Sequence, residues 1–161
     1  MQVYFKEKQV WRVLIESVHG LKSMHDMSVM HRDIKCANIF LFKVQGISDK
    51  DLFMAKLGDM NVSKVTGAHG LNYTQTGTPY YASPEVWRDE PYSYKSDIWS
   101  LGCVIYEMMA LKPPFQAKDM DQLFRRVLRG TFPRIPGHFS NDIWMIVHSM
   151  LQQKPNKRPS C

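Results

Sequence analysis

The stretch from His31 to Asn38, with the sequence HRDIKCAN, constrains this chain more than any other. A helical pattern of apolar residues precedes it, and an apolar, strand-like run over residues 39–42 follows it. Between the two, Asp33, Lys35 and Asn38 stand at a spacing that lets one loop direct a carboxylate, an ammonium group and an amide into one small volume. The spacing therefore predicts a polar loop held between a helix and a strand.

Phosphoryl transfer requires this set of groups, because a carboxylate receives the hydroxyl proton, a cation lies near the phosphate and an amide oxygen binds a metal ion. The stretch resembles the catalytic loop of the eukaryotic protein kinases, H-R-D-x-x-x-x-N. The resemblance implies that Asp33 orients and deprotonates the acceptor hydroxyl, that Lys35 neutralises the phosphate and that Asn38 binds Mg²⁺. It also implies that Phe40 packs beneath the adenine of ATP.

A second motif, GDMN, follows another short apolar run. Its carboxylate, Asp59, at the end of a strand, is expected to hold Mg²⁺ together with Asn38 through oxygen ligands. The motif resembles the kinase metal motif D-F-G, with Met60 and Asn61 in place of Phe and Gly. Methionine is adaptable enough to pack against His31 as Phe would. Asn tolerates left-handed backbone angles, which cost an L-residue about 1–2 kcal/mol, so we expect the metal site to survive.

Residues 77–85, GTPYYASPE, resemble the kinase substrate-docking loop and end in an A-P-E-type motif with Ser83 where Ala is usual. Together with Lys35 two residues after Asp33, this form is similar to serine/threonine kinases and unlike tyrosine kinases. The resemblance implies that the hydroxyl of Thr78 contacts Asp33 and Lys35. The alternative is that the prolines and tyrosines of this stretch only shape a rigid turn.

Thr74 lies three residues before Gly77, at the place where related kinases are activated by phosphorylation. A phosphate adds close to two negative charges and needs a guanidinium partner. In the family that partner is the arginine beside the catalytic aspartate, here Arg32. Thr76 is the next candidate, and an unmodified loop threonine is the alternative.

Two further positions are expected to be structural. Asp97 opens a helix that is apolar almost all round, typical of a helix inside a lobe, and is well placed to accept hydrogen bonds from the catalytic loop. In kinases an arginine at the place of Arg158 pairs with the glutamate of the A-P-E-type motif, here Glu85. A buried pair of this kind is costly to break from one side.

The resemblance covers nearly all 161 residues and implies a mainly α (α+β) protein kinase-like fold: the C-terminal lobe, with one small β-hairpin at the active-site edge. The predicted elements are helices over residues 5–27, from Asp97 to before Pro113, over 119–129 and from a cap at Ser140, with strands over 39–42 and 55–57. The connection 43–54 is long for a hairpin and indicates a surface insertion of unknown purpose.

Kinases clamp ATP from above with a glycine-rich loop, a strand lysine and a helix glutamate, and residues 1–161 contain none of these. We therefore expect a partial kinase domain, clipped at its C-terminal end too, whose partners are a missing N-terminal lobe and proteins with Ser or Thr acceptors. It would be either a fragment of a gene model or a lone lobe, with little turnover alone. The spacing of Trp11, the strand sequence NIFL and GTPYY most resemble the NIMA-related (NEK) serine/threonine kinases.

Composition fits one globular domain, with 44% hydrophobic residues and a formal charge of +6. The Lys and Arg residues are scattered, which favours solvated surface and anionic nucleotide over a nucleic-acid patch. The most apolar segment, 98–111, is too short to span a bilayer, so no membrane partner is expected. Three cysteines without metal-ligand spacing and the lack of a signal peptide favour an intracellular, cytoplasmic protein. The family resemblance adds the cytoskeleton, centrosome or cilium.

Two other classes of function stay open. One is a degenerate kinase acting as a protein-binding module, which Met60, Asn61 and the missing lobe favour. The other is a structural interaction protein that uses the substrate-docking surface. The complete set of catalytic and metal-binding groups argues against both, since a scaffold does not need it.

Overall fold

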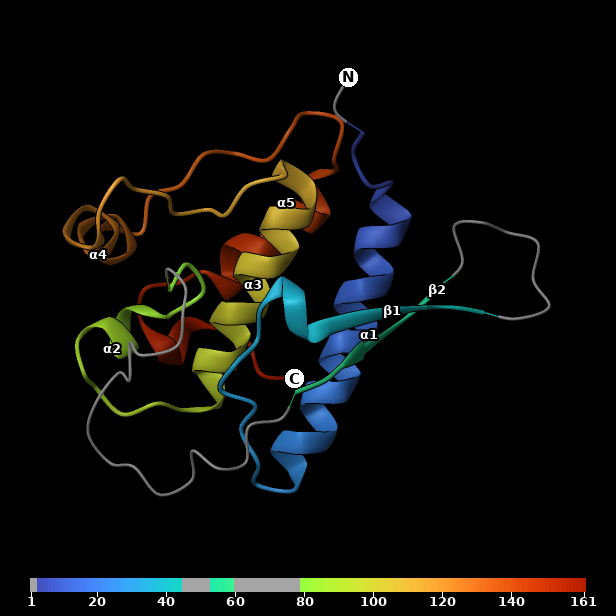
Figure 1. Cartoon of the computed structure of the whole chain (residues 1–161), viewed down its shortest axis with the longest axis horizontal. Helices are drawn as coiled ribbons and strands as arrows, with labels where there is room; N and C mark the ends of the chain where they lie inside the picture. Colours follow the sequence, from blue (N-terminus) through green and yellow to red (C-terminus); the bar gives the residue numbers. More distant parts are fainter. Residues whose placement is uncertain (1–2, 45–52, 60–78) are drawn as a thin grey trace.

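The computed structural model describes residues 3–44, 53–59 and 79–161. This part of the chain is mainly helical with one two-stranded sheet (Figure 1), which confirms the predicted fold class. In chain order the elements are α1 (Glu7–Asp26), the 3₁₀ turn η1 (Cys36–Asn38), β1 (Ile39–Lys43), β2 (Phe53–Leu57), α2 (Pro84–Trp87), α3 (Tyr94–Ala110), α4 (Met120–Arg129), α5 (Asn141–Met150) and the 3₁₀ turn η3 (Pro155–Lys157). The three-residue turns and the four-residue α2 were not predicted, because one turn of helix carries no periodic signal.

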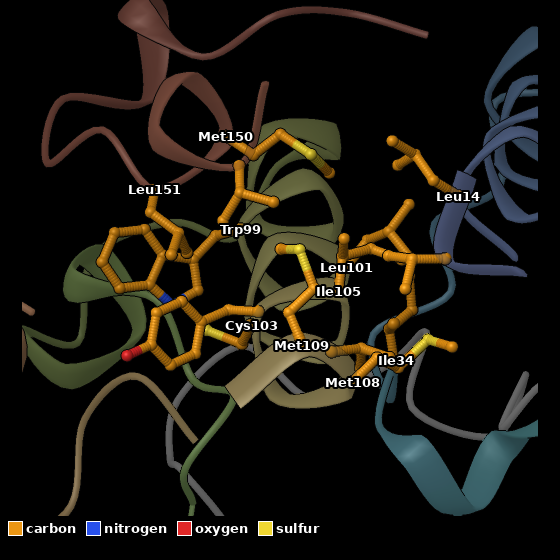
Figure 2. Close-up of a cluster of buried hydrophobic side chains, with 14 of the residues drawn as sticks. Leu14, Ile34, Trp99, Leu101, Cys103, Ile105, Met108, Met109, Met150 and Leu151 are labelled. Atoms are coloured by element: carbon orange, nitrogen blue, oxygen red, sulfur yellow. The ribbon is translucent and has the colours of Figure 1, made fainter. Parts of the chain in front are cut away.

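Helix α3 lies at the centre of the core, with α1 on one side and α5 on the other (Figure 1). Figure 2 shows Leu14 of α1 and Ile34 on one side of α3, with Met150 and Leu151 on the other. Because neighbours surround it, α3 is apolar on every face, as predicted. Helix α3 ends at Ala110, a few residues before Pro113. The next residue, Leu111, takes a left-handed conformation with φ 55° and donates its N–H to the carbonyl of Glu107.

Helix α1 buries the predicted apolar stripe against α3, although Val18 is only half-buried. The same helical periodicity predicts that the polar face opposite this stripe is solvated, and this prediction is wrong for Arg12 and Glu16. Arg12 Nη1 donates to the carbonyl of Phe53 at 3.4 Å, and the Glu16 carboxylate accepts from the N–H of Ala55. These side chains bind the backbone of β2, whose polar groups need partners where the strand lies against the helix.

Strands β1 and β2 pair antiparallel, with Ile39 opposite Leu57 and Lys43 opposite Phe53. Both strands are longer than predicted, and most of the connection between them lies outside the described residues. Alternation places one face of the sheet against α1, where Ala55 is buried. The opposite face is open: the exposed fraction is 48% for Phe40, 47% for Phe42 and 40% for Met54.

The cap predicted at Ser140 is confirmed, whereas Asp119, predicted as the first residue of a helix, is the N-cap of α4. Asp119 accepts from the N–H of Gln122 at 2.8 Å at the start of α4, and Gly130, with φ 70°, ends it. Ser140 accepts from the N–H of Ile143 at 3.4 Å at the start of α5. None of the helices in the described part of the chain has the length and apolar character that crossing a lipid bilayer requires.

Candidate active site

The loop between α1 and β1 has a backbone that needs external support. Arg32 has φ 67°, a left-handed conformation that costs an L-residue about 1–2 kcal/mol. The support comes from Asp97 in the first turn of α3, whose side chain is fully buried. The N–H of His31 donates to Asp97 Oδ2 at 3.0 Å, and the N–H of Arg32 donates to Oδ1 at 2.9 Å. The central helix therefore holds the loop through one carboxylate.

Two side chains that the sequence reasoning missed complete the shell around Asp97. His25, in the last turn of α1, lies with Nε2 2.9 Å from Oδ2, and the hydroxyl of Tyr92 donates to Oδ1 at 2.7 Å. Burial and the adjacent charge of Asp97 raise the pKa of Tyr92, so the hydroxyl keeps its proton and remains a donor. The signal that could have revealed these two side chains was the carboxylate of Asp97 on a buried helix, because a carboxylate has more acceptor sites than two backbone N–H groups can fill.

The loop brings its three functional side chains together. Asp33 Oδ2 accepts from Lys35 Nζ at 3.0 Å and from Asn38 Nδ2 at 3.1 Å. Asn38 Nδ2 also donates to the backbone carbonyl of Asp33 at 2.8 Å. Both side-chain bonds fall on Oδ2 of Asp33, and within the described ranges no hydrogen bond to its Oδ1 is found. The Asp33 side chain is 20% exposed and that of Lys35 is 37% exposed, so both are accessible from solvent.

Asp59 lies next to this loop because of the strand pairing. One residue beyond the last pair of the sheet, the N–H of Gly58 donates to the carbonyl of Asn38 at 2.9 Å. Asp59 follows directly and is exposed, with φ 55°. Since the amide nitrogen of Asn38 is engaged by Asp33, its amide oxygen and the Asp59 carboxylate are the oxygen donors that suit Mg²⁺.

The described residues contain no group of three or more His, Cys, Asp and Glu side chains that could hold a metal ion. A magnesium ion bound by Asn38 and Asp59 would therefore complete its shell with water or phosphate oxygens. Mg²⁺ commonly keeps several waters and binds through one or two protein groups. The donor set fits this mode.

The half-exposed ring of Phe40 lies over the backbone of Gly58. A Cβ added at Gly58 would lie 2.5 Å from Cε2 of Phe40 and 2.8 Å from Cδ2, closer than carbon atoms can approach. Gly58 therefore lets the Phe40 ring lie close against the backbone at the strand end that leads to Asp59.

Gly58→Ala should displace the Phe40 ring and lower the free energy of unfolding by about 1 kcal/mol, measured by urea denaturation. Gly20→Ala, on the α1 side of the same strand, is the matched control. Its Cβ would come no closer than 3.3 Å to a side-chain atom of Leu57, and alanine is favoured over glycine in a helix by about 0.8–1.0 kcal/mol. Equal losses for the two variants would contradict the contact with Phe40.

Glu85 and Arg158, 73 residues apart, form a two-pronged buried pair. Arg158 Nη1 donates to Glu85 Oε1 and Nη2 to Oε2, both at 2.7 Å. Ser96 Oγ donates to Oε1 at 2.6 Å, and the guanidinium lies 5.0 Å from the centre of the Trp99 ring. Glu85 and Arg158 are each 2% exposed. The pair therefore connects the first turn of α2 with the residue that follows η3.

The remaining predicted residues are placed only in part. His31 is buried, and its Nδ1 lies 3.4 Å from the N–H of Asp33. Met60, Asn61, Thr74, Thr76 and Thr78 lie outside the described residues. The contact of Thr78 with Asp33 and Lys35, and the pairing of a phosphothreonine with Arg32, therefore stay predictions. Near the loop, the hydroxyl of Tyr81 donates to Glu107 at 2.8 Å, a contact that the sequence reasoning missed.

Comparison with known proteins identifies related chains. The family model described as the protein kinase domain matches residues 1–161. The chain is 39% identical over 155 residues to mouse (Mus musculus) serine/threonine-protein kinase Nek4, covering 96% of this chain and 19% of that protein. It is 42% identical over 158 residues to the probable serine/threonine-protein kinase nek3 of Dictyostelium discoideum, and the match covers 97% of this chain and 14% of that protein. It is 40% identical over 159 residues to human (Homo sapiens) serine/threonine-protein kinase Nek5, and the match covers 98% of this chain and 22% of that protein.

The predicted resemblance to the NIMA-related kinases is thereby confirmed. The chain spans about a fifth or less of the length of the first relatives that it matches, Nek4 and nek3. The match to the protein kinase domain includes the loop in which Lys35 and Asn38 donate hydrogen bonds to Asp33. By sequence, this chain belongs to the protein kinase domain family.

Proposed function

We propose that this chain forms the catalytic-loop and substrate-facing part of a serine/threonine protein kinase, which transfers the γ-phosphate of ATP to Ser or Thr hydroxyls of proteins. The observation that carries the proposal is the convergence of Lys35 and Asn38 on Asp33 Oδ2, at 3.0 and 3.1 Å. The names of the related proteins support the serine/threonine specificity.

Each group has a defined task. Asp33 Oδ1 orients the acceptor hydroxyl and receives its proton, while Lys35 neutralises charge on the transferring phosphate. The oxygens of Asn38 and Asp59 hold Mg²⁺, which supplies charge neutralisation on ATP when bound. Phe40 offers its half-exposed ring to the adenine.

Asp33→Asn in a longer protein that contains this chain should lower phosphate transfer from γ-labelled ATP to a Ser- and Thr-containing protein by at least about 100-fold. The reason is that the amide cannot accept the hydroxyl proton. Asp121→Asn, an exposed position on α4, is the matched control and should retain activity. Equal phosphate transfer by the unaltered protein and Asp33→Asn would exclude Asp33 as the proton acceptor and favour a binding module.

We further propose that residues 1–161 alone turn over little or no ATP. The open face of the hairpin supports this, because Phe40, Phe42 and Met54 are about half exposed where a second lobe and the adenine would cover them. Titration of this chain with ATP and Mg²⁺ by calorimetry tests the proposal. Binding in the micromolar range by the chain alone would contradict it.

A further inference from the structure

The positive charge of this chain is distributed unevenly. Residues 1–110 contain twelve Lys and Arg residues and twelve Asp and Glu residues, so their formal charges cancel. Residues 111–161 contain nine Lys and Arg residues and three Asp residues, so they carry the entire formal charge of +6. Arg158 is buried against Glu85, and the other eight cations of this segment are exposed. Such an excess gives one part of the protein surface a positive potential, which attracts anionic partners.

Helix α4 is the element that presents these cations in a defined geometry. Its buried side chains, Leu123 and Val127, are 1% and 0% exposed and face the core. A helical residue two positions further on points to roughly the opposite side, so the exposed Arg125 and Arg129 project from the outer face of α4. Figure 1 shows α4 end-on at the edge of the molecule, opposite the hairpin of β1 and β2. The two arginines therefore point away from the rest of the fold.

The two guanidinium groups lack partners in the part of the chain that the structure describes. Neither takes part in an ion pair or a hydrogen bond there, although Asp121 lies one turn before Arg125. Like charges four positions apart on a helix repel each other. The negative end of the helix dipole accounts for Arg129 in the last turn of α4, but not for Arg125, which precedes that turn. An anion that contacts both groups would relieve the repulsion.

The position of α4 is fixed from two sides. Gln153 Nε2 donates to the carbonyl of Val127 at 3.0 Å, near the end of the helix. On another side, the ring of Phe124 contacts the ring of Trp87 at a centroid distance of 5.9 Å. A partner that binds the outer face would therefore meet a helix that is already ordered, which lowers the entropic cost of binding.

We propose that the outer face of α4 binds an acidic segment of a partner protein through Arg125 and Arg129. Planar guanidinium groups bind carboxylates through two parallel hydrogen bonds. Because a helix rises 1.5 Å per residue, the two arginines start about 6 Å apart along its axis. In an extended chain, side chains two positions apart point the same way and lie about 6.6 Å apart. An extended segment with Asp or Glu at alternate positions therefore matches the pair.

Two other kinds of anionic partner fit this surface less well. A helix that lies on a membrane inserts its apolar face into the lipid, whereas the apolar face of α4, with Leu123 and Val127, is buried in the core. Proteins that bind single-stranded nucleic acid provide aromatic rings on which bases stack. The aromatic ring of α4, Phe124, is half-buried and packs on Trp87. Carboxylates of a protein are therefore the anions that the observations favour.

Fluorescence anisotropy of a labelled peptide tests the proposal in a longer protein that contains this chain, where the further segments of that protein are present too. The probe is a peptide of alternating Glu and Ser, and its counterpart has Gln in place of Glu. The Glu peptide should bind at least about tenfold more tightly than the Gln peptide. Arg125→Gln with Arg129→Gln should weaken its binding by about tenfold. Arg125→Lys with Arg129→Lys, which keeps the charge without the planar geometry, should weaken it by about threefold.

Lys8→Gln with Lys43→Gln is the matched control, because it removes the same charge from exposed positions on α1 and β1 and should leave binding unchanged. Equal weakening by the two Gln double variants, or no binding of the Glu peptide at low ionic strength, would overturn the proposal. Tighter binding of single-stranded DNA or of phosphatidylserine vesicles, lost in Arg125→Gln with Arg129→Gln, would overturn the assignment of an acidic protein. These measurements do not read phosphate transfer, so their failure leaves the proposed kinase activity standing.

Discussion

Arg158→Met should lower the free energy of unfolding by about 3–5 kcal/mol, among the largest single-residue effects on stability in this chain. The substitution leaves the Glu85 carboxylate buried, with only the hydroxyl of Ser96 as a side-chain donor among its described contacts. It also removes the guanidinium that donates to the carbonyls of Lys95 and Gln152, at 2.9 and 2.8 Å. The melting temperature should fall by about 10 °C for a chain of this size.

The pH dependence of stability gives a second, independent signature of the pair. Burial alone would raise the pKa of Glu85, but hydrogen bonds from Arg158 and Ser96 outweigh it and hold the pKa below its usual value of 4.5. In the unaltered protein this stabilisation is complete above pH 4.5 and is lost as the pH falls through the lowered pKa. In Arg158→Met burial dominates and raises the pKa, so the contribution of Glu85 should reverse sign and stability should increase on acidification.

Urea denaturation between pH 3.5 and 7 measures both effects. Arg125→Met, an exposed position on α4, is the matched control and should change stability by less than about 0.5 kcal/mol. The double variant Arg158→Met with Glu85→Leu should lose less free energy of unfolding than the sum of the losses of the two single variants, because it leaves no unpaired buried charge. Strictly additive losses would show that the two side chains do not stabilise one another.

Asp97→Asn should cost about 3 kcal/mol, although it replaces one atom. Asp97 accepts from the N–H of His31, the N–H of Arg32, His25 and the hydroxyl of Tyr92. The asparagine side chain turns one accepting oxygen into a donor, which then faces groups that also donate. Each hydrogen bond to a charged group contributes about 1.5–3 kcal/mol, and a buried donor left unsatisfied adds its desolvation cost.

Asp119→Asn is the matched control for this change, since it also lies at the start of a helix. Asp119 uses its oxygens to cap α4, and asparagine caps helices about as well as aspartate. Urea denaturation should therefore show a large loss for Asp97→Asn and almost none for Asp119→Asn. Amide exchange should also accelerate at Arg32, whose left-handed backbone loses its support. Similar stability of the two variants would contradict the role of Asp97 as the support of the loop.

Local spacing explains why part of this site was predictable. Asp33, Lys35 and Asn38 lie within six residues, so one loop conformation brings them together, and the observed bonds of 3.0 and 3.1 Å span only two and five positions. The cap at Ser140 was predictable for a similar reason, because an N-cap side chain bonds to its own first turn.

Contacts between distant elements were less predictable from pattern alone. Arg12 and Glu16 follow the polar periodicity of a solvated helix face, yet both bind the backbone of β2. Arg12 and Glu16 bind this backbone only because the sheet lies against α1, and the sequence pattern does not show where the sheet lies. The pairing of Glu85 with Arg158 came from family resemblance, since each residue alone is typical of a surface charge.

By itself the sequence determined which polar groups the loop of residues 31–38 brings together and roughly where the long helices begin, because both depend on neighbours a few positions away. The tertiary structure alone decided what supports those groups: His25 from the end of α1 and Tyr92, just before α3, meet at the Asp97 carboxylate. The physical reason is that a buried carboxylate must fill its acceptor sites, and the packing of α1 and α3 selects the donors that can reach it.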